Sequence, residues 1–134
     1  MPHLVVLYTA NLDAQTTMSV LCRRLADAML TVKDESSKQV FPTGGVRVLA
    51  FPAPHYAVAD GRLDYAFVYL NLRMGRGRSD AVKQRVGETV LAAAKNYLEP
   101  LFAKRLIGMT LQIDEGQEVF DAKHSTIHPL FSGS

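Results

Sequence analysis

The sequence has very little cysteine. Among its 134 residues Cys22 is the single one. An intrachain disulfide is therefore impossible, and a metal site would have to be built from histidine and carboxylate side chains. One cysteine also fits a reducing compartment.

Long apolar runs are missing as well. Unbroken apolar runs such as residues 4–8 and 66–70 are far short of the ~20 residues that a membrane-spanning helix needs. The N-terminus has no basic segment, and its apolar stretch lies too close to Asn11 and Asp13 to be a signal peptide. We therefore expect no contact with a membrane and a cytoplasmic location.

Charge of one sign is not in large excess. Fifteen basic and 13 acidic residues leave a net charge of +2, which is too small to indicate nucleic acid without an accompanying motif. With 48% apolar residues over 134 positions, the composition instead predicts a single globular domain, 1–134, with one core.

Two patterns of apolar residues alternate along the chain. Apolar runs rich in β-branched and aromatic residues predict strands over residues 3–9, 46–51, 63–72 and 105–114. Apolar residues at steps of three and four predict two helices. The first follows from about residue 13 and includes Cys22 on its apolar face, where we expect it in the core. Ser79 is the expected N-cap of the second, which reaches residue 102.

The connections carry their own signals. Pro52 and Pro54 withhold backbone donors, which favours an edge or irregular course for the second strand. Asp60-Gly61 is typical of a turn that joins two hairpin strands. Residues 73–78 contain two glycines and are predicted to form a loop. Residues 120–131 mix apolar and polar side chains and are predicted as a short strand or an extended arm.

The predicted elements follow the order strand, helix, strand, and then repeat it. Residues 4–8 resemble residues 66–70, which indicates an internal duplication with halves of about 2–60 and 61–131. Two right-handed βαβ units in one sheet predict an α/β (α+β) fold with four strands and both helices on one face. Since the other face would be lined with apolar side chains, we expect a symmetric oligomer that covers it.

The sequence begins Met1-Pro2-His3. Initiator methionine is usually removed before a small residue, which would leave the secondary amine of Pro2 at the end of a buried strand. Apolar walls and nearby cations would favour the neutral amine, and a neutral amine can act as a general base near neutral pH. By itself, proline at the first residue of a strand is more often only structural.

Basic residues cluster before the second helix. Five cations fall within thirteen residues, opposed only by Asp80: Arg73, Arg76, Arg78, Lys83 and Arg85. Guanidinium groups before a helix N-terminus suit a carboxylate ligand, and a solvated basic rim would account for the pattern equally well. Arg47 differs because it lies inside an apolar strand, where it needs an acidic side chain or an acidic ligand.

Motifs along the whole chain keep one order. They are Met1-Pro2-His3 before an apolar strand, Phe41-Pro42-x-x-Gly45-Val46-Arg47, Ala59-Asp60-Gly61-x-x-Asp64-Tyr65-Ala66-Phe67-Val68 and Arg73-Met74-Gly75-x-Gly77-Arg78-Ser79. From residue 2 to 131 this pattern resembles the 5-carboxymethyl-2-hydroxymuconate isomerase family, a branch of the tautomerase superfamily. The resemblance implies a doubled βαβ fold assembled as a homotrimer, in agreement with the bare sheet face.

The resemblance also implies roles for single residues. Pro2 is similar to the family's N-terminal proline base, and Arg47 to its substrate-binding arginine. Arg78 matches a recurrent Gly-Arg-Ser motif, and we infer that it grips a second carboxylate with Arg73 as a helper. The implied reaction is the keto–enol isomerisation of an unsaturated 2-hydroxy di- or tricarboxylate during the breakdown of aromatic compounds, with no cofactor and no metal. Apolar walls around Pro2 are expected from Phe41, Phe51 and Phe67.

Two other functions stay open at this point. One is a non-catalytic trimer that binds acidic small molecules or a partner protein through the basic rim. The other is a tautomerase relative that performs hydration or decarboxylation. The sequence departs from the family pattern at Leu7 and Ala10, because close relatives are expected to have acidic residues near these positions. His124 and His128 are spaced like two metal ligands on a helix, but Pro129 makes a helix improbable there, so we interpret them as surface histidines.

Overall fold

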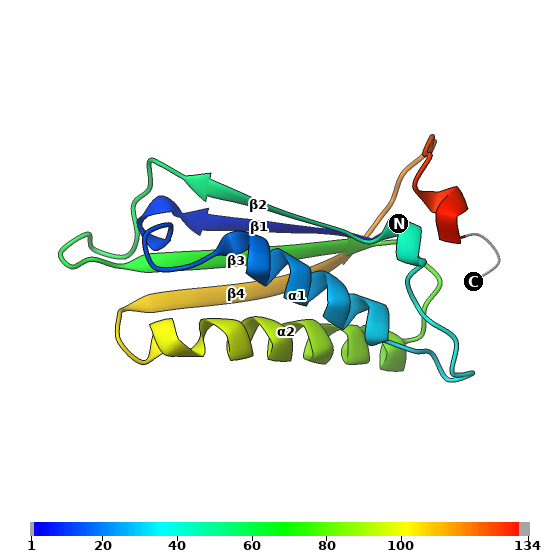
Figure 1. The fold of residues 1–134 in the computed structure, drawn as a ribbon, viewed down its shortest axis with the longest axis horizontal. Helices are drawn as coiled ribbons and strands as arrows, with labels where there is room; N and C mark the ends of the chain where they lie inside the picture. The colour runs from blue at the N-terminus through cyan, green and yellow to red at the C-terminus, as the bar shows by residue number, and fades with distance from the viewer. Residues whose placement is uncertain (1, 132–134) are drawn as a thin grey trace.

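Within residues 2–131, which the computed structural model describes, the chain forms one sheet and two long helices (Figure 1). The strands are β1 (His3–Thr9), β2 (Arg47–Ala53), β3 (Ala66–Met74) and β4 (Ile107–Glu115). The helices are α1 (Met18–Thr31) and α2 (Asp80–Phe102), and short 3-10 turns occur at η1 (Ala10–Leu12), η2 (Thr43–Gly45) and η3 (His128–Phe131). Neither α1 nor α2 is long and apolar enough to cross a membrane.

The sheet has the strand order β2-β1-β3-β4. β1 is parallel to β2 and β3 is parallel to β4, whereas β1 and β3 are antiparallel. Each half is therefore a βαβ unit, as predicted, and the halves meet at the centre of the sheet. The edge position of β2, which contains Pro52, is also confirmed. The predicted hairpin at Asp60-Gly61 is wrong, because β1 lies between β2 and β3 and the turn belongs to a longer loop.

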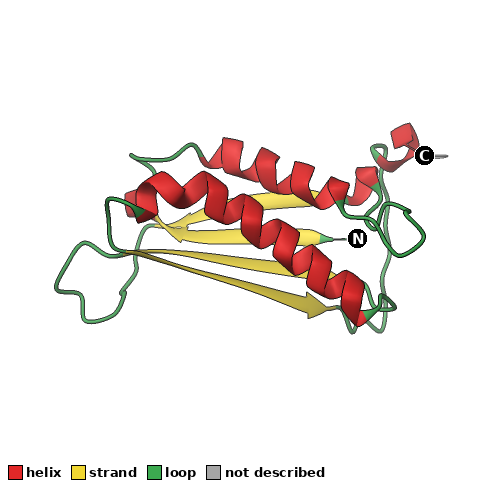
Figure 2. Cartoon of the chain, turned by 90° about the horizontal axis from the view of Figure 1, so that it is seen from below, coloured by secondary structure: helices red, strands yellow, loops and turns green. Residues whose placement is uncertain are grey.

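Both helices cover the same face of the sheet (Figure 2). Alternate residues of β1 and β3, such as Leu4 and Leu70, are fully buried beneath them. The N-cap of α2 is confirmed, since the Ser79 hydroxyl accepts a hydrogen bond from the Val82 N–H at 3.2 Å. α1 begins at Met18 rather than near residue 13, because the chain first forms the η1 turn.

No helix covers the opposite face of the sheet within the described chain (Figure 2). Apolar side chains on this uncovered face reach solvent: Leu7 is 44% exposed, Leu49 52% and Phe51 48%. In the sheet Leu7 pairs with Phe51, so the departure at Leu7 belongs to this apolar area. The predicted bare face is confirmed.

After β4 the chain forms an arm, residues 116–131, that crosses the end of the sheet where β1 begins (Figure 1). The Gly116 N–H donates to the Met74 carbonyl at 2.8 Å, which fixes the first residue of the arm to β3. The far end packs on η2, where a Cβ added to Gly44 would lie 2.7 Å from the His128 Cα. The extended-arm prediction is confirmed, and the alternative of a short strand is wrong.

Candidate active site

A row of basic side chains crosses the uncovered face near the start of β1. The sheet register places His3 between Arg47 of β2 and Arg73 of β3. Because side chains alternate along a strand and Leu4 faces the helices, these three project from the uncovered face. Strands lie about 4.8 Å apart, so the two arginines start from backbones separated by roughly 10 Å. The site residue Arg73 lies on β3 itself and not in the loop where the sequence placed it.

Arg47, His3 and Arg73, which we call the cationic row, form one wall of a cavity of about 290 Å³. The arm forms the opposite wall with Glu118, Asp121, Lys123 and His124. Pro2 is buried directly before His3. A cavity of this size approaches the volumes at which small-molecule ligands bind, and its walls are mainly charged.

The two arginines of the row differ in their partners. Arg73 pairs with Glu118, with 3.3 Å between Nη2 and Oε1. The Arg47 guanidinium donates to the Gly45 carbonyl at 2.9 Å, and no carboxylate of residues 2–131 forms an ion pair with it. No side chain of the described residues is therefore the acidic partner of Arg47, and an acidic ligand as its partner stays a prediction.

His3 reports on the electrostatics of the cavity. Burial lowers the pKa of His3 below its usual value. The positive charges of Arg47 and Arg73 lower this pKa further, by a smaller amount. The lowered pKa favours the neutral imidazole of His3 near neutral pH, so the positive charge of the row comes from the two arginines.

Arg78, predicted to grip a carboxylate, does not line this cavity. Its guanidinium donates to the Gly75 carbonyl at 2.9 Å and to the Val40 carbonyl at 3.2 Å. The same group lies over the Phe41 ring, 5.2 Å from its centroid. In this chain Arg78 ties the loop after β3 to the segment before η2.

The three phenylalanines expected as an apolar wall do not line this cavity. Phe41 is fully buried in the core, Phe51 is exposed on the uncovered face, and none of the three lines the cavity. Cys22 is also not a core residue, because it is only partly buried beside the edge of β2, where burial raises the pKa of its thiol. Neither the wall nor the core placement could be decided from local periodicity.

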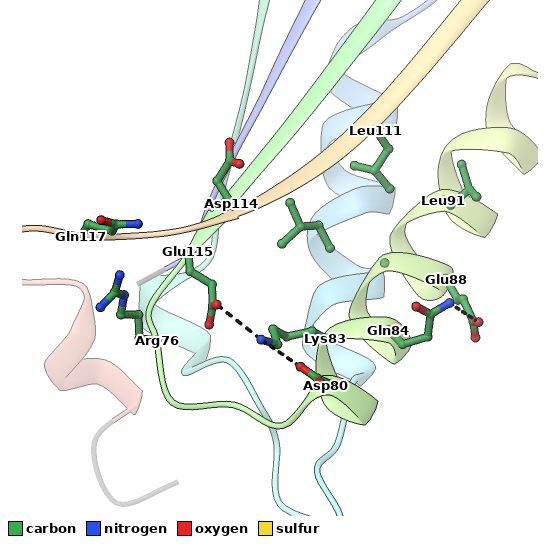
Figure 3. Close-up of a pocket in the computed structure, with 12 residues that line it drawn as sticks. Arg76, Asp80, Lys83, Gln84, Glu88, Leu91, Leu111, Asp114, Glu115 and Gln117 are labelled. Carbon is green, nitrogen blue, oxygen red and sulfur yellow. Dashed lines mark hydrogen bonds and ion pairs between the residues drawn. The ribbon is translucent and has the colours of Figure 1, made fainter.

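The N-terminus of α2 already holds a carboxylate of the chain. The Ser79 hydroxyl donates to Glu35 at 2.5 Å, and this hydrogen bond lowers the pKa of the Glu35 carboxyl. Lys83 bridges Asp80 at 3.2 Å and Glu115 at 3.3 Å in a groove of about 950 Å³ between α2 and β4 (Figure 3). These pairings favour the interpretation of a solvated basic rim for this part of the cluster.

Sequence reasoning missed the acidic residues of the arm. Asp121 accepts from Lys123 at 2.5 Å, and this hydrogen bond lowers the pKa of the Asp121 carboxyl. Nothing in the local pattern of residues 116–131 indicates that they cross the cationic row. His124 lines the cavity and His128 packs on Gly44. In the described part of the chain no three histidine, cysteine or acidic side chains gather as metal ligands.

Sequence comparison connects this arrangement with a family. The profile of the family 5-carboxymethyl-2-hydroxymuconate isomerase matches residues 2–131. The chain belongs to this family. The resemblance of the sequence motifs is thereby confirmed, and the chain is classed with the enzymes of the isomerase type.

Relatives cover nearly the whole chain. A 5-carboxymethyl-2-hydroxymuconate Delta-isomerase of Escherichia coli is 27% identical over 131 residues, which are 98% of this chain and 99% of that protein. A crystal structure of a 5-carboxymethyl-2-hydroxymuconate delta-isomerase is 57% identical, with a TM-score of 0.96 over 100% of this chain and 95% of the other. A 5-carboxymethyl-2-hydroxymuconate isomerase from Deinococcus radiodurans R1 is 32% identical, with a TM-score of 0.85 over 97% and 93%.

The seat of the arm can be tested at Gly44. In Gly44→Ala the new Cβ would lie 2.7 Å from the His128 Cα, so η2 and η3 must move apart. We expect a loss of about 1 to 3 kcal/mol in the free energy of unfolding, as for other overpacked sites, measured by urea denaturation. Gly75→Ala is the control, because its Cβ would meet nothing nearer than the Arg78 Nη1 at 3.7 Å. Equal stability of the two variants would contradict the close packing.

Proposed function

We propose that the chain is a cofactor-independent keto–enol isomerase with Pro2, freed by removal of Met1, as general base. Its substrate would be an unsaturated 2-hydroxy di- or tricarboxylate such as 5-carboxymethyl-2-hydroxymuconate. The observation that carries the proposal is the position of Pro2, buried beside a cationic row in which Arg47 has no carboxylate partner among the described residues.

The reaction moves one proton and needs no outside electrons. The neutral Pro2 nitrogen takes the proton of the enol hydroxyl, and the electron pair left on oxygen forms the carbonyl. The π electrons of the diene shift along the conjugated chain, and the prolyl ammonium returns the proton to the carbon at which they accumulate. Since nothing is oxidised or reduced overall, the residues of the site suffice.

The arginines would stabilise charge during this transfer. Arg47 lies one strand from His3, and it would hold the carboxylate beside the enol or the oxygen on which negative charge develops. Arg73 would bind a distal carboxylate from the other side of His3. Arg78 is engaged by two carbonyls, so we now assign it to ordering the loop that borders the site rather than to a carboxylate contact.

The proposal is tested with the processed protein and 5-carboxymethyl-2-hydroxymuconate. Intact mass first shows whether Met1 is absent, and ultraviolet absorbance then follows loss of the conjugated dienol. Conversion to an isomer of unchanged mass is the expected result. Binding without conversion would favour the acidic-ligand module, and a product heavier by water or lighter by carbon dioxide would favour hydration or decarboxylation.

The homotrimer is the second part of the proposal. Exposed Leu7, Leu49 and Phe51 on the uncovered face support association, and the family resemblance implies three subunits. Sedimentation equilibrium should give about three times the chain mass of 14.8 kDa. A stable monomer at micromolar concentration would remove this part of the proposal.

A matched pair of variants locates the interface. Leu49→Lys places a charge on the uncovered face, where Leu49 is 52% exposed, and should dissociate the trimer. Val20→Lys adds the same charge on α1, where Val20 is 40% exposed, and should leave the mass unchanged. If Val20→Lys dissociates the assembly and Leu49→Lys does not, the interface lies on the helical side.

A further inference from the structure

We propose that Glu118 is a specificity-determining residue: the carboxylate of the chain's own arm occupies Arg73 and competes there with the second carboxylate of a ligand. This inference rests on the proposed site. It assigns to Glu118 a role that acts through Arg73 and not by contact with the reacting atoms.

The arm holds Glu118 over the cationic row. Glu118 follows Gly116 by two residues, and the Gly116 N–H is fixed to the Met74 carbonyl at the end of β3. The Glu118 side chain folds back against Gly116, and its Oε1 lies 3.3 Å from the Arg73 Nη2. The far end of the arm is seated on Gly44 through His128. The arm is thus anchored on both sides of the cavity that it crosses.

The row then offers one open and one occupied arginine. A monocarboxylate can bind at Arg47 without breaking an ion pair, because the only hydrogen bond that the guanidinium of this residue makes within residues 2–131 is to a carbonyl. A dicarboxylate that also reaches Arg73 must displace Glu118. Across the roughly 10 Å between the two backbones, the long arginine side chains can approach from both sides, so the carboxylates of a six-carbon diacid can reach both.

The size of the effect follows from exposure. The side chains of Arg73 and Glu118 are 53% and 43% exposed, so their ion pair is well screened. Exposed pairs of this kind change an equilibrium constant by about 1.5- to 5-fold. Loss of the Glu118 charge should therefore tighten binding of a diacid by that factor and leave a monoacid nearly unaffected.

Two ligands of equal length separate these cases. trans,trans-Muconate is a six-carbon chain with a conjugated diene between two terminal carboxylates. Sorbate has the same chain length and the same diene, with a methyl group in place of one carboxylate. Titration calorimetry on the full chain should show that Glu118→Gln lowers the Kd of muconate about 1.5- to 5-fold and leaves that of sorbate unchanged. Glu99→Gln makes the same change of charge at an exposed residue of α2 that does not line the cavity and is the control.

A double-mutant cycle tests the route through Arg73. In an Arg73→Gln background, Glu118→Gln should no longer improve muconate binding. The inference is overturned if Glu118→Gln weakens muconate or leaves it unchanged, if it tightens both ligands alike, if Glu99→Gln has the same effect, or if neither ligand binds. Glu118→Ala, which removes the same charge, should repeat the result.

These measurements are independent of turnover, because muconate and sorbate have no enol hydroxyl to isomerise. If the diacid preference appears and the isomerisation assay fails, the proposed function is wrong and the role of Glu118 stands. If isomerisation is observed and muconate binding ignores Glu118, the role of Glu118 is wrong and the proposed function stands.

Discussion

Placing one additional residue before Pro2, or retaining Met1, should abolish isomerisation. Either change turns the prolyl amine into an amide, whose nitrogen has no basic lone pair. General-base catalysis contributes typically ~100- to 10,000-fold, so kcat/KM of the extended protein should fall by at least this factor. The measurement is the initial rate with 5-carboxymethyl-2-hydroxymuconate, on preparations whose N-terminus has been established by intact mass.

Controls separate chemistry from folding. The extended protein should keep the sedimentation mass of the processed one, and Pro54→Ala, at an exposed proline of the loop after β2, should keep its activity. Pro2→Ala retains a primary amine at the same place and should keep part of the activity. Undiminished turnover by the Met1-retaining protein would refute the proline mechanism. It would favour the alternative in which the chain is a module that binds acidic ligands.

The pH profile gives a second view of the same amine. The kcat/KM should rise with pH as the amine loses its proton, and an α-amino group ordinarily titrates near ~8. Arg47 and Arg73 flank the neighbouring His3. Burial is the largest cause that lowers the pKa of His3, and the charges of the two arginines lower it further. Positive neighbours destabilise the protonated amine as well. The rise of kcat/KM should therefore occur at a lower pH in the unmodified protein than in the Arg47→Ala variant. A limb that stays in place in this variant would show that Arg47 does not affect the base.

Arg47→Ala should lower kcat/KM by roughly 10- to 100-fold. A charge-assisted hydrogen bond contributes about 1.5 to 3 kcal/mol, and Arg47 is the arginine of the row without a carboxylate partner in the described chain. Within residues 2–131 its guanidinium makes one hydrogen bond, to the Gly45 carbonyl, so the loss should appear in substrate handling more than in stability. Steady-state kinetics and thermal unfolding of the same variant measure the two effects.

Arg62→Ala is the matched control for Arg47. Arg62 lies in the loop before β3 and pairs only loosely with Asp60, at 4.0 Å and with a side chain that is 85% exposed. Its removal deletes the same charge at a residue that does not line the cavity. It should leave kcat/KM within about 2-fold, since exposed pairs contribute little. Equal losses in the two variants would count against a specific role for Arg47.

The sequence by itself determined the local elements. Apolar steps of three and four and a Ser79 cap describe α2 because helix geometry and capping depend on neighbours a few residues apart. The order of two βαβ units and the bare sheet face followed from the same local patterns. Family motifs pointed to Pro2, Arg47 and Arg78, and the basic cluster added Arg73. Arg47 and Arg73 line one cavity, Pro2 directly precedes His3 of its wall, and Arg78 does not line it.

Only the tertiary structure decided which segments meet. Insertion of β1 between β2 and β3 replaced the expected hairpin and set His3 between two arginines. The tertiary structure also brings the guanidinium of Arg78 to the Val40 carbonyl and Glu118 to Arg73. These contacts join residues that are tens of positions apart in the sequence, and they depend on strand pairing and on the path of the arm. No periodicity encodes them, because periodicity reports only which side of a single element is buried.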